Sequence, residues 1–223
     1  MSADTHSGVP ILRLRTAALP VLALMSFLAL PGLATAQCST SGNAPCAGAM
    51  LTTYYNTFAP PNGLADNTVE LINPVGSAAA SGNLPVVNVC AMIYTFDSNE
   101  NMGECCGCLV TPQGLLTLSV RNNLTSNWIV PGGRPIAGAI DVVSASTNGG
   151  NAGSCNAATA YTLSPALNGY ITHSVDNAEL QFANAGDPSS AAQNSLVSRC
   201  AALQGNATGA GICSCNPQVI NPL

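Results

Sequence analysis

The sequence predicts a mainly β protein: an antiparallel β-sandwich with one packed C-terminal helix, reinforced by disulfides. Several short stretches alternate apolar and polar side chains and are separated by turn residues. One stretch alone has clear helical spacing, whereas a parallel sheet would need a helix between successive strands. The chain also has ten cysteines, a number typical of cross-linked proteins in oxidising compartments.

The first 36 residues have the pattern of an export signal. Arg13 and Arg15 precede an apolar run from Ala17 to Leu33, and the small residues Ala34-Thr35-Ala36 then form a cleavage site. We therefore expect a signal peptide over 1–36 and a secreted protein, extracellular or periplasmic. Prolines inside the apolar run argue against a permanent anchor, so no membrane span is expected after cleavage.

The domain boundaries follow from a change of pattern near residue 68. Residues 37–68 are interpreted as an N-terminal arm, because the stretch from Met50 to Phe58 fits neither a helical nor a strand period clearly. Residues 69–223 are expected to form one disulfide-linked sandwich domain. The chain that remains after the signal is long enough to bury a core without help, so the disulfides reinforce the fold.

Five stretches predict strands. Val69 to Val75 alternates imperfectly and is expected to be an outer strand, whereas Val86 to Phe96 is apolar on both faces and predicts a central one. Leu115 to Asn122 alternates cleanly, with one face buried and one exposed to water. Ile136 to Ser146 and Gly169 to Val175 follow the same rule more weakly.

One helix is predicted near the C-terminus. Asp187 is a candidate N-cap, Pro188 suits the first helical position, and the helix is expected to end before Gly205. Its apolar stripe consists of Ala192, Leu196, Cys200 and Leu203. Because Cys200 lies on this stripe, a disulfide from it would pin the helix to the sheet.

All ten cysteines are expected to form disulfides: Cys38, Cys46, Cys90, Cys105, Cys106, Cys108, Cys155, Cys200, Cys213 and Cys215. The residues Cys105 to Cys108 form a CC-x-C cluster, and Cys213 to Cys215 form C-x-C. Pairing within a cluster is disfavoured, because strand neighbours point to opposite faces and cysteines two apart are at the limit of disulfide reach.

The pairing itself is left open among several alternatives. The CC-x-C cluster is expected to bond Cys90, Cys213 or Cys215. Cys155 with Cys200 is another candidate pair, and Cys38 with Cys46 would close a local loop. The competing interpretation is a zinc or iron–sulfur site, against which stand the export signal and the absence of the C-x-x-C spacing of zinc ribbons.

A weak metal site is the main cofactor candidate. Asp97, Asn99, Asn101 and Glu104 offer oxygen atoms in the manner of a calcium loop. The glycine that such a loop needs is replaced by Met102, and the glutamate comes too early. A polar hairpin loop without an ion is the alternative that the spacing favours, and no other cofactor is expected.

Catalytic signatures are weak. His173 is the one histidine after the signal, and it alternates with Ile171, as a core residue would. No Gly-x-Ser-x-Gly motif accompanies it. A carboxylate hydrolase would need an acid pair such as Asp141 and Glu179, and Trp128 is the one tryptophan that could bind a glycan. We therefore expect no enzyme.

The net charge of the chain limits the classes of molecule that it can bind. The chain has a net charge of −5, and all five of its basic residues are arginines. This excludes nucleic-acid binding, which needs clustered positive charge. The chain has no lysine, a residue that often protects exposed sheet edges. The partners that this composition favours are further copies of the chain or components of a cell surface.

Several motifs resemble one group of exported proteins. Cys90 to Asp97, Glu104 to Cys108 and Thr111 to Leu115 are similar to segments of uncharacterised Cys-rich proteins with CC-x-C, exported by environmental bacteria. Ile171 to His173 and Gly211 to Cys215 are similar too. The resemblance implies export and a shared Cys-rich fold, and it lends no catalytic residue to this chain.

These observations favour a secreted structural or surface-interaction protein with a passive mechanism. Self-association through an exposed edge strand, such as Val69 to Val75, is one expected mode of action. The alternatives are a secreted hydrolase that uses carboxylates and a calcium- or glycan-binding module.

Overall fold

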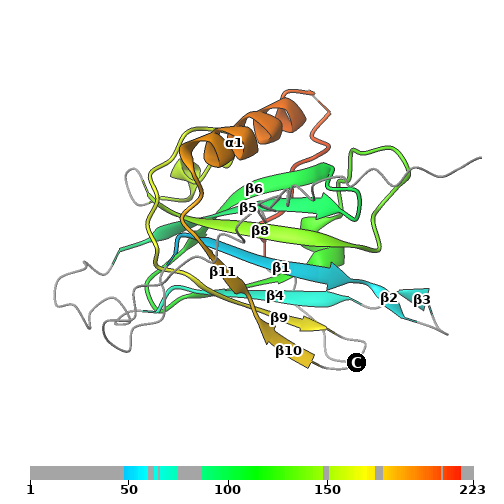
Figure 1. Cartoon of the computed structure of the whole chain (residues 1–223), viewed down its shortest axis with the longest axis horizontal. Coiled ribbons are helices and arrows are strands. Elements are labelled where there is room, and N and C mark those ends of the chain that lie inside the picture. The colour runs from blue at the N-terminus through cyan, green and yellow to red at the C-terminus, as the bar shows by residue number, and fades with distance from the viewer. Residues whose placement is uncertain are drawn as a thin grey trace, which may run out of the picture. The chain divides into compact units, whose positions relative to one another are not determined.

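The computed structural model describes residues 48–59, 63–64, 66–74, 87–147, 151–173, 178–206 and 208–216 (Figure 1). These residues all belong to one compact unit, Ala36–Leu223. The predicted signal peptide and the expected Cys38–Cys46 pair lie outside the described residues.

Nine of the described strands form two antiparallel sheets, so the predicted fold class is confirmed. The five-stranded sheet has the order β11 (Ala183–Gly186), β1 (Met50–Asn56), β8 (Ala137–Ser146), β5 (Val89–Asp97) and β6 (Met102–Val110). The four-stranded sheet has the order β10 (Ala178–Gln181), β9 (Asn168–His173), β4 (Asn67–Ile72) and β7 (Leu115–Ser119). A small hairpin pairs β2 (Phe58–Ala59) with β3 (Gly63–Leu64).

The two sheets share one buried core, as a sandwich requires. Val69 and Leu71 of β4 and Ile171 of β9 enter this core from the four-stranded sheet. Ala91 and Ile93 of β5 enter it from the five-stranded sheet, and all five side chains are fully buried. The alternating pattern of β4 and β9 therefore marks the face that each strand turns inward.

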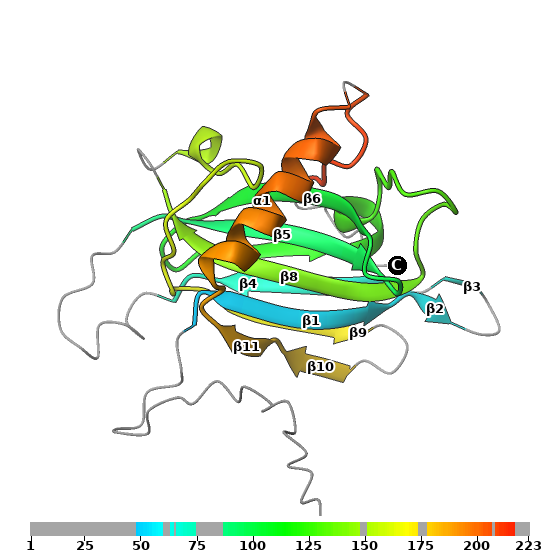
Figure 2. The same ribbon diagram turned by 45° about the horizontal axis from the view of Figure 1, so that its top comes forward.

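A second core lies on the other face of the five-stranded sheet. The helix α1 (Ser190–Gln204) covers this face, and Figure 2 shows it crossing the strands obliquely. Leu196 and Cys200 of α1 pack with Met92 and Tyr94 of β5. Because β5 faces one core on each side, every residue from Val89 to Phe96 is buried, as the doubly apolar sequence predicts.

The start of α1 differs from the prediction. Its N-cap is Ser189, whose hydroxyl accepts a hydrogen bond from Ala192 N at 3.2 Å. Asp187 instead accepts a hydrogen bond from Ala49 N at 2.8 Å and so ties the approach to the helix to the start of β1. The expected helix end is confirmed, with Gly205 as the C-cap.

The order of the strands corrects two expectations. The stretch from Val69 was expected at an edge, but β4 lies between β9 and β7 and is central. The stretch from Met50, expected in an arm, forms β1 between β11 and β8. Alternation reveals that one face is buried, but it does not reveal how many strands pair with the backbone.

Candidate functional site

Four disulfides join the eight cysteines among the described residues. They are Cys90–Cys155, Cys105–Cys200, Cys106–Cys213 and Cys108–Cys215. The smallest separation along the chain is 65 residues, so none of these four bonds is local, as the strand geometry predicts. A protein with this many disulfides belongs to an oxidising compartment.

Two expected pairings are wrong, and the faces of the five-stranded sheet explain why. Cys90 was expected to bond the CC-x-C cluster, but its side chain lies on the helix side and bonds Cys155. Cys155 was expected to bond Cys200, which instead bonds Cys105. Cys105 also lies on the helix side, so this bond pins α1 to β6, as predicted for a bond from the helix stripe.

The other face of β6 carries the two remaining bonds, to Cys213 and Cys215. We call residues 211–216 the C-terminal strap. The strap lies along β6, where Cys105 N donates to Gly211 O at 2.9 Å and Cys213 N donates to Cys105 O at 3.2 Å. The expected pairing of the CC-x-C cluster with the C-x-C pair is thus confirmed for Cys106 and Cys108.

The strap also contacts the chain that follows β7. Ser214 N donates to Asn123 O at 2.9 Å, and Asn123 Nδ2 donates to Asn216 O at 2.7 Å. Asn123 belongs to the π-helical turn η2 (Val120–Leu124), directly after β7. The strap therefore connects an edge of the five-stranded sheet with the connection that leaves the four-stranded sheet.

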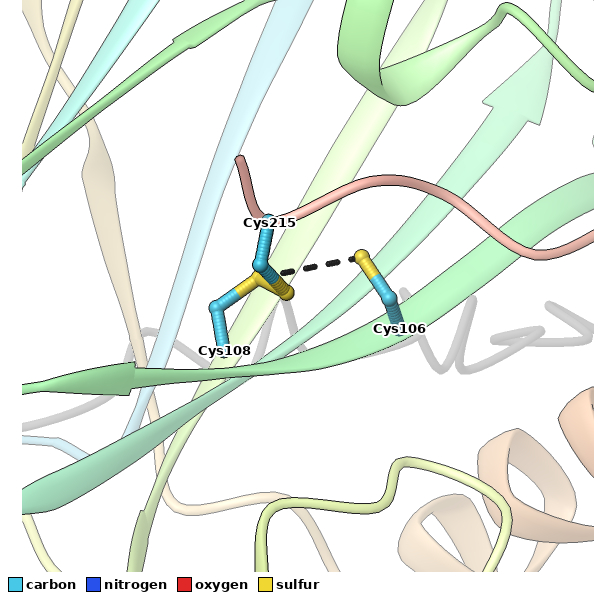
Figure 3. A group of neighbouring side chains, drawn as sticks. All are labelled: Cys106, Cys108 and Cys215. Atoms are coloured by element: carbon cyan, nitrogen blue, oxygen red, sulfur yellow. Dashed lines mark hydrogen bonds between the residues drawn. A yellow bond between two sulfur atoms is a disulfide. The ribbon is translucent and has the colours of Figure 1, made fainter. Parts of the chain in front are cut away.

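Three sulfur atoms of this region lie within 4.8 Å of one another, those of Cys106, Cys108 and Cys215 (Figure 3). The Sγ atoms of Cys106 and Cys108 are 3.8 Å apart. A metal would need thiolates, whereas each of these sulfurs is bonded to another sulfur. The group is therefore a pair of adjacent cross-links in this structure.

Three of the residues considered for calcium lie in the hairpin between β5 and β6. The Asp97 carboxylate accepts hydrogen bonds from Asn99 N at 2.8 Å and from Asn101 N and Nδ2 at 2.9 and 3.2 Å. Burial would raise the pKa of Asp97, but the hydrogen bonds from Asn101 and Asn99 together outweigh it and lower the pKa. The contacts describe a polar hairpin turn, and the calcium interpretation stays a prediction.

Glu104, the fourth of these residues, is fully buried in β6. Its Oε1 accepts a hydrogen bond from Asn127 N, and its Oε2 has no hydrogen-bond partner among the described residues. Burial raises the pKa of Glu104 to about 8, opposed by this hydrogen bond and by the Arg134 charge. The carboxyl group is therefore mostly protonated at neutral pH.

His173 and Trp128 both pack against other residues of the fold. His173 is buried at the end of β9, and its ring stacks on Tyr54 with centroids 4.8 Å apart. Its Nε2 has no hydrogen-bond partner within the described part of the chain. Trp128 is half-buried, with its indole directly over Gly103, where a Cβ would come within 2.3 Å of the ring.

The acid pair considered for a hydrolase is not brought into one sheet. Asp141 lies in β8 of the five-stranded sheet, and Glu179 is exposed on β10 of the other sheet. Asp141 instead lines a groove beneath α1 together with Asp97 and Arg199. Ala192, Leu196 and Arg199 recur at helical spacing, so Arg199 lies on the side of α1 that carries the apolar stripe.

Comparison with known proteins adds no family. No protein-family model matches the chain, and neither a curated protein nor a solved structure matches it. Within the described ranges, no helix has the length and apolar character needed to cross a membrane. The resemblance to exported Cys-rich proteins therefore stays a prediction.

Proposed function

We propose that this chain is a secreted structural or surface-interaction protein that acts as a rigid, cross-linked body. The observation that carries the proposal is the C-terminal strap, held along β6 by Cys106–Cys213 and Cys108–Cys215. These bonds close loops of 107 residues each and restrict the unfolded chain strongly. Such a body withstands conditions outside the cell without any catalytic machinery.

Export is part of the proposal. The sequence pattern over residues 1–36 is that of a signal peptide, and the disulfides require an oxidising compartment. The extracellular space and the periplasm both meet this requirement. A secreted protein with a structural role gains from cross-links that typically contribute about 2 to 4 kcal/mol each, although such contributions are not additive.

Self-association through a sheet edge is the proposed mode of interaction. With β4 central, the edge strand that fits this role is β10, which pairs only with β9 among the described strands. Glu179, Leu180 and Gln181 of β10 are exposed, and Leu180 adds an apolar side chain to this edge. A second copy of the chain could continue the sheet here by backbone hydrogen bonds.

The test has two parts. Protein isolated from the cells that make it should be found outside the cytoplasm and should contain no reduced cysteine, by alkylation and mass spectrometry. Light scattering at increasing concentration should show oligomers that Leu180→Lys abolishes. The control Ile136→Lys changes an exposed residue outside the edge strands and should leave the oligomers intact. Reduced cytoplasmic protein would overturn the secreted role, and monomers at all concentrations would overturn the self-association.

A further inference from the structure

A groove of about 400 Å³ lies between α1 and the face of the five-stranded sheet that the helix covers. Leu196 and Arg199 contribute to it from α1, and Met50, Phe96 and Asp141 from β1, β5 and β8. This volume lies within the range of sites that hold small molecules. The groove is formed by regular elements, and Cys105–Cys200 fixes the helix over the sheet.

Much of the lining is apolar. Phe96 and Leu196 are each exposed by less than a tenth, and Met50 and Ala139 complete an apolar surface around them. Because Phe96 and Leu196 are already packed in the second core, they lose little freedom when a ligand covers them. The hydrocarbon part of a ligand is therefore accommodated here at low entropic cost.

The charged lining is predominantly acidic. Three acidic residues, Asp97, Glu100 and Asp141, line the groove together with one basic residue, Arg199. Arg199 Nη2 donates a hydrogen bond to the Glu100 carbonyl oxygen at 2.9 Å, and its guanidinium carbon lies 5.2 Å from the centre of the Phe96 ring. Arg199 is thus held at the rim, and the groove as a whole favours a cation.

Asp141 is the carboxylate best placed to receive that cation. Asp97 is occupied by the amides of its own hairpin, whereas Asp141 accepts a hydrogen bond from the Thr52 hydroxyl. A carboxylate offers about four acceptor positions, so Asp141 retains capacity for a ligand. Burial raises the pKa of Asp141 despite the Thr52 hydrogen bond, which means that its charge is poorly stabilised until a cation approaches.

We propose that this groove binds a small amphipathic molecule that carries a protonated primary amine. The ammonium group donates hydrogen bonds to the Asp141 carboxylate, and the hydrocarbon part lies against Phe96 and Leu196. This binding activity goes beyond the structural role proposed above and does not depend on it.

The first test compares three probes of equal length: hexylammonium, 1-hexanol and hexanoate. Titration followed by NMR chemical shifts should give hexylammonium a Kd of about 1 mM or tighter, at least about tenfold tighter than hexanol. The shifted resonances should come from α1 and from β8. Equal affinity for hexanol, or tightest binding of hexanoate, would overturn the proposal.

Three variants complete the test. Asp141→Asn should weaken hexylammonium binding at least about tenfold and leave hexanol binding unchanged. Glu70→Gln removes the same charge from β4 in the four-stranded sheet, outside the groove, and should have almost no effect. Ala192→Phe fills the groove from an exposed helix position and should weaken the binding of both probes. Unchanged hexylammonium binding to Asp141→Asn would refute the assignment.

Discussion

Gly103 shows how a single missing side chain shapes this protein. Its position in β6 is covered by the indole of Trp128, and an added Cβ would lie 2.3 Å from the ring. We expect Gly103→Ala to displace Trp128 and to lower the free energy of unfolding by about 2 kcal/mol, because overpacking forces side chains out of their preferred positions. Urea unfolding followed by the fluorescence of Trp128 measures both effects.

The matched control is Gly153→Ala. Gly153 lies in an exposed turn, where the nearest atom to an added Cβ is Asn151 Oδ1 at 3.4 Å. The same substitution should therefore change stability by less than about 0.5 kcal/mol. Equal effects of the two variants would show that Trp128 does not pack on Gly103.

Glu104 predicts a pH dependence of stability. Its pKa is about 8 in the folded protein and near 4.5 when the chain is unfolded, so between these values the folded state retains a proton that the unfolded state releases. Stability therefore falls as the pH rises from 4.5 to 8. Glu104→Gln cannot ionise, so its free energy of unfolding relative to that of the wild type should rise by about 4 kcal/mol from pH 4 to pH 8.

Urea unfolding at the two pH values measures this difference. Glu179→Gln makes the same chemical change at an exposed position and serves as the matched control. If Glu104→Gln and the wild type differed equally at pH 4 and pH 8, folding would not change the pKa of Glu104, which would contradict the prediction.

For single residues, the sequence predicted the direction of a side chain better than it predicted which cysteine bonds to which. The alternation that places His173 beside Ile171 is present in β9, where both are buried. The bonding partner of Cys90 could not be predicted, because a cysteine in a doubly buried strand has candidates on both sides of the sheet. The choice depends on the tertiary structure, which places Cys155 on the same side of the sheet as α1 and the Cys90 side chain.

At the scale of elements, the start of α1 can be tested by its cap. Ser189 accepts a hydrogen bond from Ala192 N, and its replacement leaves that amide without a partner. We expect Ser189→Ala to destabilise the protein by about 1 kcal/mol in thermal unfolding. Ser198→Ala in the middle of the same helix should be neutral or slightly stabilising, and a larger loss there would contradict the assignment of the cap.

The disulfides should differ in their sensitivity to reductant. Seven of the eight described cysteines are buried, and Cys215 is only partly buried. Since exchange requires access of a thiolate to a sulfur atom, limiting dithiothreitol should open Cys108–Cys215 first. Alkylation at successive times, with mass spectrometry of the peptides, gives the order; initial opening of Cys105–Cys200 would contradict it.

Element prediction succeeded for the most apolar strand and for the helix, but it missed the buried strand β6 and two strands that have few apolar residues. The doubly apolar β5 and the helix α1 were both expected. The strands β10 and β11 were missed, because their sequences AELQ and ANAG contain no β-branched residue and are largely exposed. They form because Phe182 between them is buried in the sandwich core.

For the molecule as a whole, the short strands β10 and β11 connect the two sheets. β10 pairs in the four-stranded sheet and β11 in the five-stranded sheet, so the chain crosses from one sheet to the other at Phe182. The C-terminal strap connects the opposite margin, between β6 and η2. Both margins of the sandwich are therefore bridged by the chain itself.

The groove could not be predicted from sequence, because its parts belong to separate patterns. Asp97 was considered for a calcium loop or a polar hairpin and Asp141 for an acid pair, and neither pattern refers to the helix that contains Arg199. Only the packing of α1 across the sheet gathers them in one place. Local sequence patterns contain no information on which way a helix crosses a sheet.

The positions of the strap cysteines along the chain also determine when their disulfides can form during biosynthesis. Cys106 and Cys108 emerge 107 residues before their partners, and Cys105 emerges 95 residues before Cys200. Until then, these three thiols can reach one another and the cysteines at 38, 46, 90 and 155, and any bond that one of them forms must later be exchanged. Maturation of this protein is therefore expected to depend on a disulfide isomerase, and a strain without one should accumulate mispaired, short-lived product.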